Sequence, residues 1–364
     1  MTVDVQQIVQ DELDAIVADD RELGIQVAVY RYGELIVDAW SGHSEPTRSA
    51  VVQSDTLFPI FSCSKGLMYT IVHLLAERGE LDYDARIGEY WPEFAQNGKE
   101  DATLRQVLVH SSGVQDITHD FHIDDWDDTC ARLAASTALW APGTETAYRG
   151  LSSGFILGEV SRRVYGRPYG EVLAELVCAP LGIDDMFYGV PDSVRSRIAV
   201  LESDESVLTG PAASPDTRIM ADLFNSPSVQ ASAVPAGGAI TSARSLAKHY
   251  ASLIGDGVDG VRLLPHDRVD LATSLATDAF DQTHKREVRK GLGYLLGDGT
   301  MAQGGRLNTF GHSGFGGSYG FADPDYGLGF ALTKNRLVSA VPPEVPVSVH
   351  MANTVREALS VPHS

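Results

Sequence analysis

The sequence predicts an α+β fold in which an antiparallel sheet, flanked by helices, is interrupted by a large and mostly helical insertion. Two β-rich runs joined at a Tyr-Gly pair occupy residues 24–42, and a stretch dense in glycine, aromatic and β-forming residues occupies 309–336. Between residues 80 and 235, helical patterns alternate with Pro/Gly loops, and strand signals are few. Because a lone hairpin is not stable, we expect the two ends of the chain to pair in one sheet.

A division into two domains follows from this arrangement. Residues 1–79 and 236–364 are expected to form an α/β domain that holds the sheet and its flanking helices. Residues 80–235 are expected to form a mostly helical domain, with the active site in the cleft between the two. The 364 residues are enough to build both cores.

The remaining elements are helices and one long loop. Apolar residues at near-helical spacing from Val5 to Val17 predict a helix over 4–18. A second helix is expected over 62–79, closed by Gly79. Further helical patterns and a loop-rich stretch are expected, the helices at 103–114, 152–167, 169–182, 242–257 and 345–360 and the loop at 203–220.

The charge balance argues against nucleic acid and membrane partners. Lys and Arg total 28 and Asp and Glu total 49, so the formal net charge is −21. A surface this acidic repels phosphate backbones and anionic lipids. Most of this charge is explained by solubility alone.

Other features predict a cytoplasmic protein. No run of about 18 apolar residues is present, and the first residues are acidic and amphipathic, unlike a secretory signal. The cysteines Cys63, Cys130 and Cys178 are far apart and form no CxxC pair, which favours a reducing compartment over disulfides or a zinc knuckle.

The segment IFSCSKGLMYT, residues 60–70, holds several reactive side chains in consecutive positions. If a helix begins near Ser62, Ser62 and Lys65 share a face, whereas Ser64 points roughly 100° away from Lys65. Cys63 is expected to pack as a small apolar residue. A serine hydroxyl needs a neighbour that accepts its proton, and a lysine in a dry cleft can assist. Taken alone, the S-x-x-K pattern fits a capping serine beside an exposed lysine better.

Four blocks in order make the chain resemble the serine β-lactamase and penicillin-binding-protein superfamily, most closely its class C-like esterase branch, the family VIII carboxylesterases. The blocks are FPIFSCSKG (58–66), TLRQVLVHSSGV (103–114), APGTETAYRGLSSGFILGEVSRRVYGR (141–167) and FGHSGFGGSYGFADPDYGLGFALTKNR (310–336). The resemblance covers about residues 20–340. It implies a β-lactamase-like fold and acyl transfer through an acyl-serine, and we expect no cofactor.

The second motif departs from the pattern of the lactamases. The resemblance places Tyr148 at the position of the family's catalytic tyrosine. Lactamases usually continue as Tyr-x-Asn, whereas this chain reads Tyr148-Arg149-Gly150. The absent asparagine weakens the prediction of antibiotic hydrolysis and fits the esterase branch.

The third motif departs as well. His312-Ser313-Gly314 stands where many relatives have Lys-Thr-Gly. The resemblance makes these residues and Phe315 candidate catalytic or substrate-binding residues. The missing lysine removes a group that holds the β-lactam, which again fits an esterase.

The resemblance also implies roles for individual residues. Ser62 would attack the ester carbonyl, and Tyr148, as a phenolate or as a proton relay with Lys65, would take the proton and return it to the leaving alcohol. His312 would join the relay, bind substrate or act as a structural hydrogen bonder. The backbone N–H groups of Ser62 and of a residue near Phe315 would form the oxyanion hole.

Further candidates lie around these motifs. The resemblance places residues 116–130 at the border of the cleft, so Phe121 and Trp126 are candidates for shaping an acyl pocket. Arg149 either contacts an acidic substrate or is a solvated surface arginine, and His110 is expected to brace the site. The histidines and aspartates of 116–130 show no recognisable ligand spacing, so we expect a solvated loop and no metal.

The predicted function is therefore a serine esterase that cleaves carboxylic esters, lactones included, of small-molecule substrates. An acyltransferase with the same acyl-serine is the first alternative. A β-lactamase or D-amino-acid peptidase is less favoured, and a non-catalytic binding module least. A homo-oligomer is compatible with the sequence.

Overall fold

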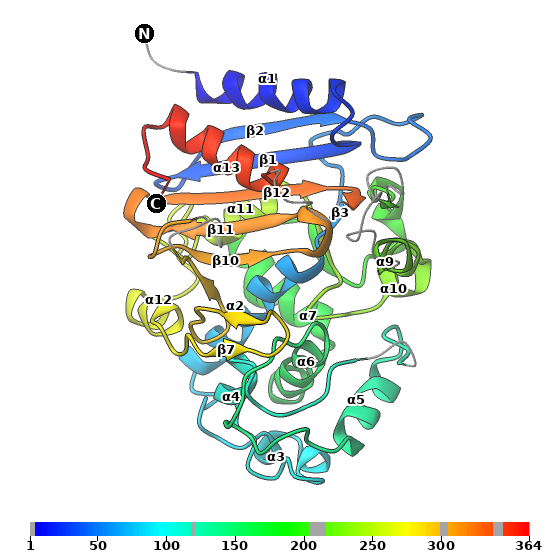
Figure 1. Cartoon of the computed structure of the whole chain (residues 1–364), viewed down its shortest axis with the longest axis vertical. Helices are drawn as coiled ribbons and strands as arrows, with labels where there is room; N and C mark the ends of the chain where they lie inside the picture. The colour runs from blue at the N-terminus through cyan, green and yellow to red at the C-terminus, as the bar shows by residue number, and fades with distance from the viewer. Residues whose placement is uncertain (1–3, 118–120, 204–215, 299–304, 338–344, 364) are drawn as a thin grey trace.

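The structure is a computed structural model that describes residues 4–117, 121–203, 216–298, 305–337 and 345–363 (Figure 1). Its largest element is a six-stranded antiparallel sheet of order β2-β1-β12-β11-β10-β9. β1 pairs with β12 from Ile25 opposite Lys334 to Arg31 opposite Leu328, so the predicted pairing of the two chain ends is confirmed. The strands are β1 (Gly24–Arg31), β2 (Glu34–Gly42), β9 (Leu295–Leu296), β10 (Phe310–Ser313), β11 (Tyr319–Asp323) and β12 (Leu328–Lys334).

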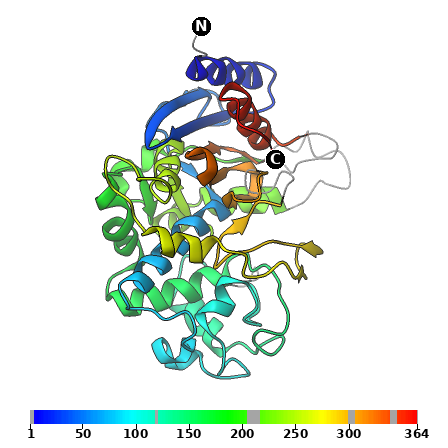
Figure 2. The ribbon, with the colours of Figure 1, turned by 90° about the vertical axis from the view of Figure 1, so that its left-hand side faces the viewer.

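Three helices cover the two faces of this sheet (Figure 2): α1 (Val5–Ala18), α13 (Val347–Ala358) and α11 (Ala243–Ala251). Side chains alternate between the faces of a strand. Val27 and Val29 therefore pack with α1 and α13, whereas Ala28 lies in the core on the α11 side. A Cβ at Gly329 would lie 2.7 Å from the Cβ of Ala251, so the close approach of α11 to β12 needs glycine there.

α2 (Ser64–Glu77) runs through the middle of the molecule and contacts both β10 and α6 (Ser152–Tyr165) (Figure 1). Every side chain from Ser64 to Ala76 is buried, which is typical of a helix enclosed on all sides.

No helix of the described ranges is long and apolar enough to cross a bilayer. The helical elements between residues 80 and 235 are α3 (Ile87–Tyr90), η2 (Pro92–Phe94), α4 (Leu104–Leu108), α5 (Trp126–Ala135), α6 (Ser152–Tyr165), α7 (Tyr169–Leu173), the π turn η3 (Ala174–Cys178), α8 (Ala179–Leu181), η4 (Asp192–Arg197), α9 (Asp216–Asn225) and α10 (Pro227–Ala231).

A small three-stranded sheet, β3-β6-β4, joins the segment before α2 to the rest of the fold. Its central strand pairs with both neighbours, and Thr241 lies opposite Phe58 on one side and Met186 on the other. The strands of this and the lesser sheets, with the remaining helical elements, are β3 (Phe58–Pro59), β4 (Met186–Tyr188), β5 (Glu202–Ser203), β6 (Ala239–Thr241), β7 (Phe280–Asp281), β8 (Arg286–Glu287), β13 (Arg336–Leu337), α12 (His266–Thr273), η6 (Phe315–Gly317) and η7 (Pro324–Tyr326).

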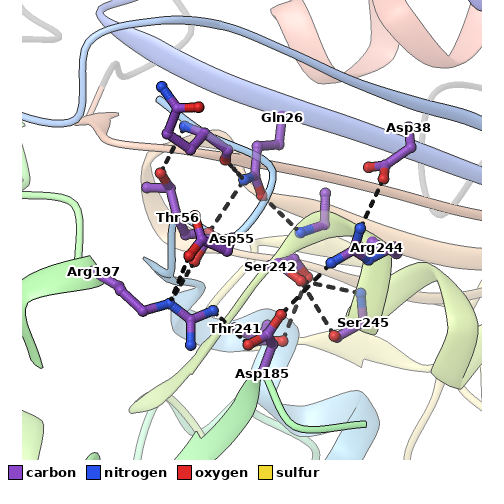
Figure 3. Close-up of polar contacts among 12 residues, drawn as sticks. Gln26, Asp38, Asp55, Thr56, Asp185, Arg197, Thr241, Ser242, Arg244 and Ser245 are labelled. Carbon is purple, nitrogen blue, oxygen red and sulfur yellow. Dashed lines mark hydrogen bonds and ion pairs between the residues drawn. The ribbon is translucent and has the colours of Figure 1, made fainter. Parts of the chain in front are cut away.

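A polar network ties this region to the large sheet (Figure 3). The side chain of Gln26 on β1 donates to the carbonyl of Thr56 at 3.1 Å and accepts the N–H of Ala243 at 3.0 Å. Arg244 donates to Asp38 of β2 at 3.0 Å. These bonds hold both the chain that leads into β3 and the start of α11 against the sheet.

Two predicted helices are shorter than expected. The pattern at 103–114 forms α4, which ends at Leu108, because His110 adopts φ +60° and cannot continue the helix. The pattern at 242–257 forms α11, which ends at Ala251, and Gly255 and Gly257 beyond it take positive φ. The pattern at 169–182 is instead helical over nearly its whole length, as α7, a π turn and α8, and ends where Gly182 takes a left-handed conformation.

The loop expected at 203–220 is also corrected in part. Residues 204–215 lie outside the described residues, and α9 begins at Asp216, so 216–220 is helical. The division into domains at residues 79 and 236 stays a prediction.

Candidate active site

The candidate nucleophile Ser62 lies in a 3₁₀ turn, η1 (Phe61–Cys63), directly before α2 and not within it. Phe61 has φ +46°, a left-handed conformation that is costly for a bulky residue and clusters at functional sites. Its ring packs against those of Phe224 and Phe315, at centroid distances of 4.8 and 5.7 Å. This packing supports the turn, in which Ser62 is half-buried.

Ser64 takes a structural position instead. Its hydroxyl donates to the carbonyl of Phe61 and accepts the N–H of Ala239 at 3.0 Å. The side chain is fully buried, so it ties β6 to the turn and is not exposed to a substrate. The difference in orientation between Ser62 and Ser64 agrees with the helical-face argument.

The side chains of Ser62, Lys65 and Tyr148 meet at one point. The Ser62 Oγ accepts from the Tyr148 hydroxyl at 2.9 Å and from the Lys65 Nζ at 3.3 Å. The Lys65 amine also donates to the carbonyls of Gly150 at 2.6 Å and Ala236 at 3.0 Å. The structure thus brings the three predicted catalytic residues together.

The surroundings set the protonation of these groups. Burial lowers the pKa of Lys65 to about 7, an effect that the nearby carboxylate of Asp116 opposes. Burial raises the pKa of Tyr148, although the hydrogen bond to Ser62 opposes this. A neutral amine is therefore accessible at neutral pH, whereas a phenolate is not. Of the two roles that the sequence left open for Tyr148, this environment favours the relay.

The loop that carries Tyr148 is held by residues that sequence reasoning missed. The N–H of Tyr148 donates to both carboxylate oxygens of Asp281 at 3.0 Å, and the Thr283 hydroxyl donates to the Tyr148 carbonyl at 3.0 Å. The Tyr148 ring contacts the rings of His110 and His284, each at a centroid distance of 4.9 Å. These contacts fix both the backbone and the ring of Tyr148.

Asp281 is itself half of a buried ion pair. The Lys290 Nζ lies 2.6 Å from its carboxylate and donates to the Thr146 hydroxyl at 2.9 Å, and both charged side chains are fully buried. Burial raises the pKa of Asp281, but the bonds from Lys290 and the backbone N–H groups outweigh it, so the pKa lies below its usual range. No spacing in the sequence links residues 281 and 290 to residue 148.

His312 is buried beside the Tyr148 ring, at a centroid distance of 5.8 Å. Its Nδ1 lies 2.7 Å from the Ser313 carbonyl, so this nitrogen carries the proton and Nε2 keeps a lone pair that has no hydrogen-bond partner. Burial lowers the pKa of His312 to about 3, and the Lys65 charge adds to the effect. A neutral imidazole thus lies where many relatives have an ammonium group.

The end of β10 lies directly against the nucleophile turn. The Cys63 thiol donates to the His312 carbonyl at 3.3 Å. A Cβ at Gly314 would lie 2.4 Å from the Ile60 carbonyl oxygen, so only glycine allows this approach. Ser313 and Phe315 are exposed on either side of Gly314.

The candidate pocket residues have other contacts. Phe121 is buried, with the Arg132 guanidinium 4.2 Å from its ring centroid. Trp126 donates to Glu159 at 2.8 Å and lines a groove of about 1160 Å³ whose walls do not include the three residues that meet at Ser62. A role for Phe121 and Trp126 in an acyl pocket stays a prediction.

Arg149 is half-buried and not a freely solvated arginine. Its guanidinium lies 4.9 Å from the ring centroid of Trp140, and one of its terminal nitrogens is buried without a hydrogen-bond partner. The backbone N–H of Arg149 donates to the Nδ1 of His110 at 3.1 Å, which agrees with the expected bracing role of His110.

The stretch of histidines and aspartates at 116–130 is described only in part. His119 lies outside the described residues. Elsewhere in the chain, within the described ranges, no three His, Cys, Asp or Glu side chains are grouped to hold a metal ion.

Comparison with known proteins identifies the family. A scan against models of protein families matches residues 9–346 to the family described as Beta-lactamase. The chain belongs to this beta-lactamase family. It is similar to the protein named Esterase/beta-lactamase LipL of Mycobacterium tuberculosis strain H37Rv, with 31% identity over 337 residues that cover 87% of this chain and 78% of LipL.

Solved structures of similar proteins have the same fold over nearly the whole chain. A family VIII carboxylesterase superposes with a TM-score of 0.87 at 32% identity, covering 97% of each chain. A penicillin-binding-protein homologue from Caulobacter crescentus superposes with a TM-score of 0.84 at 30% identity, covering 98% of each chain. The predicted membership of the esterase branch and the β-lactamase-like fold are confirmed.

Proposed function

We propose that this chain is a serine hydrolase that cleaves carboxylic esters of small molecules through an acyl-Ser62 intermediate. The observation that carries the proposal is the convergence of the Tyr148 hydroxyl and the Lys65 amine on the Ser62 Oγ, at 2.9 and 3.3 Å. The similarity to a protein named as an esterase and to a family VIII carboxylesterase supports it.

The first half of the reaction forms the acyl-enzyme. The Ser62 Oγ attacks the ester carbonyl carbon and gives its proton to the relay formed by Tyr148 and the neutral amine of Lys65, both of which contact the Oγ. As the bond to the alkoxide breaks, the ammonium returns a proton along the same path, and the alcohol leaves. A pKa of about 7 suits Lys65 to both steps, because the amine gains and loses the proton readily near neutral pH.

The second half releases the acid. Water attacks the acyl carbon, gives a proton to the same relay, and Ser62 regains a proton as its bond to the acyl group breaks. We assign the oxyanion to the backbone N–H groups of Ser62 and Phe315. Each such donor is typically worth about 10²–10³ in rate.

The groups around Ser62 favour esters over β-lactams. Gly150 offers no side-chain amide to a lactam, and the free nitrogen of His312 is an acceptor that does not bind a carboxylate. Transfer of the acyl group to an alcohol or amine in place of water remains the alternative, because it uses the same acyl-Ser62. Lactones belong to the same substrate class.

Intact-mass spectrometry after incubation with p-nitrophenyl acetate or butyrate tests the proposal. The protein should gain the acyl mass on the peptide that contains Ser62 and release p-nitrophenolate. Ser62→Ala should lose both, with turnover at least about 10³-fold slower. Nitrocefin turnover as fast as ester turnover would favour a β-lactamase instead.

Ser64→Ala is the matched control, because it removes a hydroxyl from the same turn. Acylation should persist, while the free energy of unfolding should fall by about 1–3 kcal/mol, since the Ala239 N–H loses its partner. Equal loss of acylation in the two variants would contradict the assignment of Ser62 as nucleophile.

Three further expectations accompany this function as proposals. They are a cytoplasmic location, a homo-oligomeric state, and the absence of nucleic acid and membrane partners. Fluorescence microscopy of a tagged chain tests the first, and sedimentation of the purified protein tests the second.

A further inference from the structure

The carboxylate of Asp116 binds the backbone at the start of α6. It accepts the N–H groups of Leu151 at 3.1 Å and Ser152 at 3.0 Å, and also the N–H of Gly150. Leu151, the residue before the helix, offers no side-chain cap of its own. A carboxylate brought from a distant loop therefore satisfies the free N–H groups and the partial positive charge of this helix end.

The same turn faces the amine of Lys65. The Gly150 carbonyl accepts from the Lys65 Nζ at 2.6 Å, closer than the carbonyl of Ala236 at 3.0 Å. Residue 150 is thus bonded to the Asp116 carboxylate through its N–H and to the amine through its C=O. Any movement of the turn would move the closest acceptor of the amine.

Position 150 has little room for a side chain while Asp116 stays in place. A Cβ there would lie 3.1 Å from the Asp116 Oδ2, tighter than an ordinary van der Waals contact. The asparagine that lactamases usually carry at this position would therefore compete with the carboxylate for space. Gly150 and Asp116 form a matched pair.

Among the groups around the amine, Asp116 exerts the largest electrostatic influence on Lys65. The imidazoles of His110 and His312 face the same space, but burial lowers the pKa of both, so they are neutral near pH 7.

Of the other groups near the Lys65 amine, Cys63, Tyr148 and Arg149 carry no negative charge that could stabilise the ammonium. Burial raises the pKa of the Cys63 thiol and of the Tyr148 phenol, so both keep their protons. Arg149 is a cation, and its guanidinium lies over the ring of Trp140.

We propose that Asp116 is the positioning residue of Lys65 during ester cleavage, an inference that rests on the proposed function. Its carboxylate holds residues 150–152 so that the Gly150 carbonyl meets the amine. Its negative charge stabilises the ammonium that forms when Lys65 takes up the proton of Ser62. Asp116 touches neither the substrate nor the reacting atoms.

Asp116→Asn tests this, because it keeps the size of the side chain and one carbonyl oxygen but removes the charge. The direct readout is the pKa of Lys65, measured by NMR on protein with ¹³Cε-labelled lysine and assigned with Lys65→Met. Without the countercharge the ammonium is less stable, so the pKa of Lys65 should fall, and the acid limb of kcat/KM should move to lower pH with it. The plateau kcat should drop about tenfold or more, with KM little changed.

Asp125→Asn is the matched control, because Asp125 caps α5 in the same manner by accepting the N–H of Asp128 at 3.0 Å. It should leave the Lys65 titration and the pH profile unchanged. If Asp116→Asn does not fold, Gly150→Ala decides, because the added Cβ presses on the Asp116 carboxylate and should lower the pKa of Lys65 by a smaller amount.

An unchanged Lys65 titration in Asp116→Asn, or in Gly150→Ala where the first variant is unfolded, overturns the proposal. The NMR titration needs no turnover, so it decides the role of Asp116 even in a protein that cleaves no ester. Failure of the proposed function would be seen separately, as wild-type protein that gains no acyl group on Ser62.

Discussion

The nucleophile turn, residues 60–65, and the tyrosine loop, residues 146–150, deliver side chains to the same oxygen by different means. On the turn, Ser62 and Lys65 are three residues apart and their bond is local. On the loop, Tyr148 is held by Asp281 and Thr283, more than 130 residues away in the sequence. The bond between Ser62 and Lys65 therefore depends on local geometry, although rings of Phe224 and Phe315 support the turn, whereas the position of Tyr148 depends wholly on the assembled fold.

The two regions also differ in what they bury. The nucleophile turn buries neutral groups and the single amine of Lys65, which lies among carbonyls. The tyrosine loop is anchored by a complete ion pair between Asp281 and Lys290. A buried pair is costly when one partner is lost, so the loop should be the more sensitive of the two to distant substitutions.

Among substitutions in the tyrosine loop, Tyr148→Phe should have the largest effect on kcat. It removes the hydroxyl that lies 2.9 Å from the Ser62 Oγ and leaves the backbone bonds to Asp281 intact. We expect kcat for p-nitrophenyl butyrate to fall by about 10²–10⁴, with the thermal midpoint close to that of wild type. Tyr169→Phe is the matched control, because the Tyr169 hydroxyl is buried without a partner and should be dispensable. A near-normal rate for Tyr148→Phe would remove the phenol from the relay.

Lys290→Met tests whether the ion pair holds the loop. The variant leaves the Asp281 carboxylate buried without its cation, which should cost about 3–5 kcal/mol of the free energy of unfolding and lower kcat in the folded fraction. Denaturant unfolding and steady-state kinetics measure the two effects. Lys285→Met, at an exposed position in the turn between β7 and β8, should change neither. Equal stability of the two variants would show that the ion pair is not needed.

The pH dependence of the reaction should reflect the protonation of Lys65 in the nucleophile turn. Lys65 must be a neutral amine to take the proton, and its pKa is about 7. Below that value kcat/KM should fall about tenfold per pH unit as the amine is protonated. A profile measured from pH 5 to 9 that stays flat would show that another group is the base.

The sequence predicted much of the fold and half of the site. The β-rich runs joined at a Tyr-Gly pair predicted the hairpin at 24–42, and the instability of a lone hairpin predicted the pairing of the two chain ends. The spacing of Ser62 and Lys65 was informative because residues three apart share a face of a helix. Tyr148 was found through the resemblance of its block to known relatives, since no local pattern distinguishes it from a core aromatic residue.

The partners of that site were beyond such reasoning. Asp116 begins the stretch 116–130, whose histidines and aspartates were considered only as metal ligands. No pattern of neighbouring residues marks Asp281 or Lys290 as part of the site. Their roles arise from contacts between elements that are distant in the chain, and one sequence does not encode such contacts as a spacing. The left-handed turn at Phe61 was missed as well, because its strain is supported by rings from other elements.

The local sequence thus determined which segments form helices and strands, because these depend on interactions between residues close in the chain. It also placed the Ser62 hydroxyl and the Lys65 amine three residues apart, near enough to contact each other. Tertiary structure decided how those groups are charged. Burial brings the pKa of Lys65 to about 7 and keeps His312 neutral. Removal of water and the placing of a distant carboxylate depend on how separate elements pack, and that packing exists only in the folded chain.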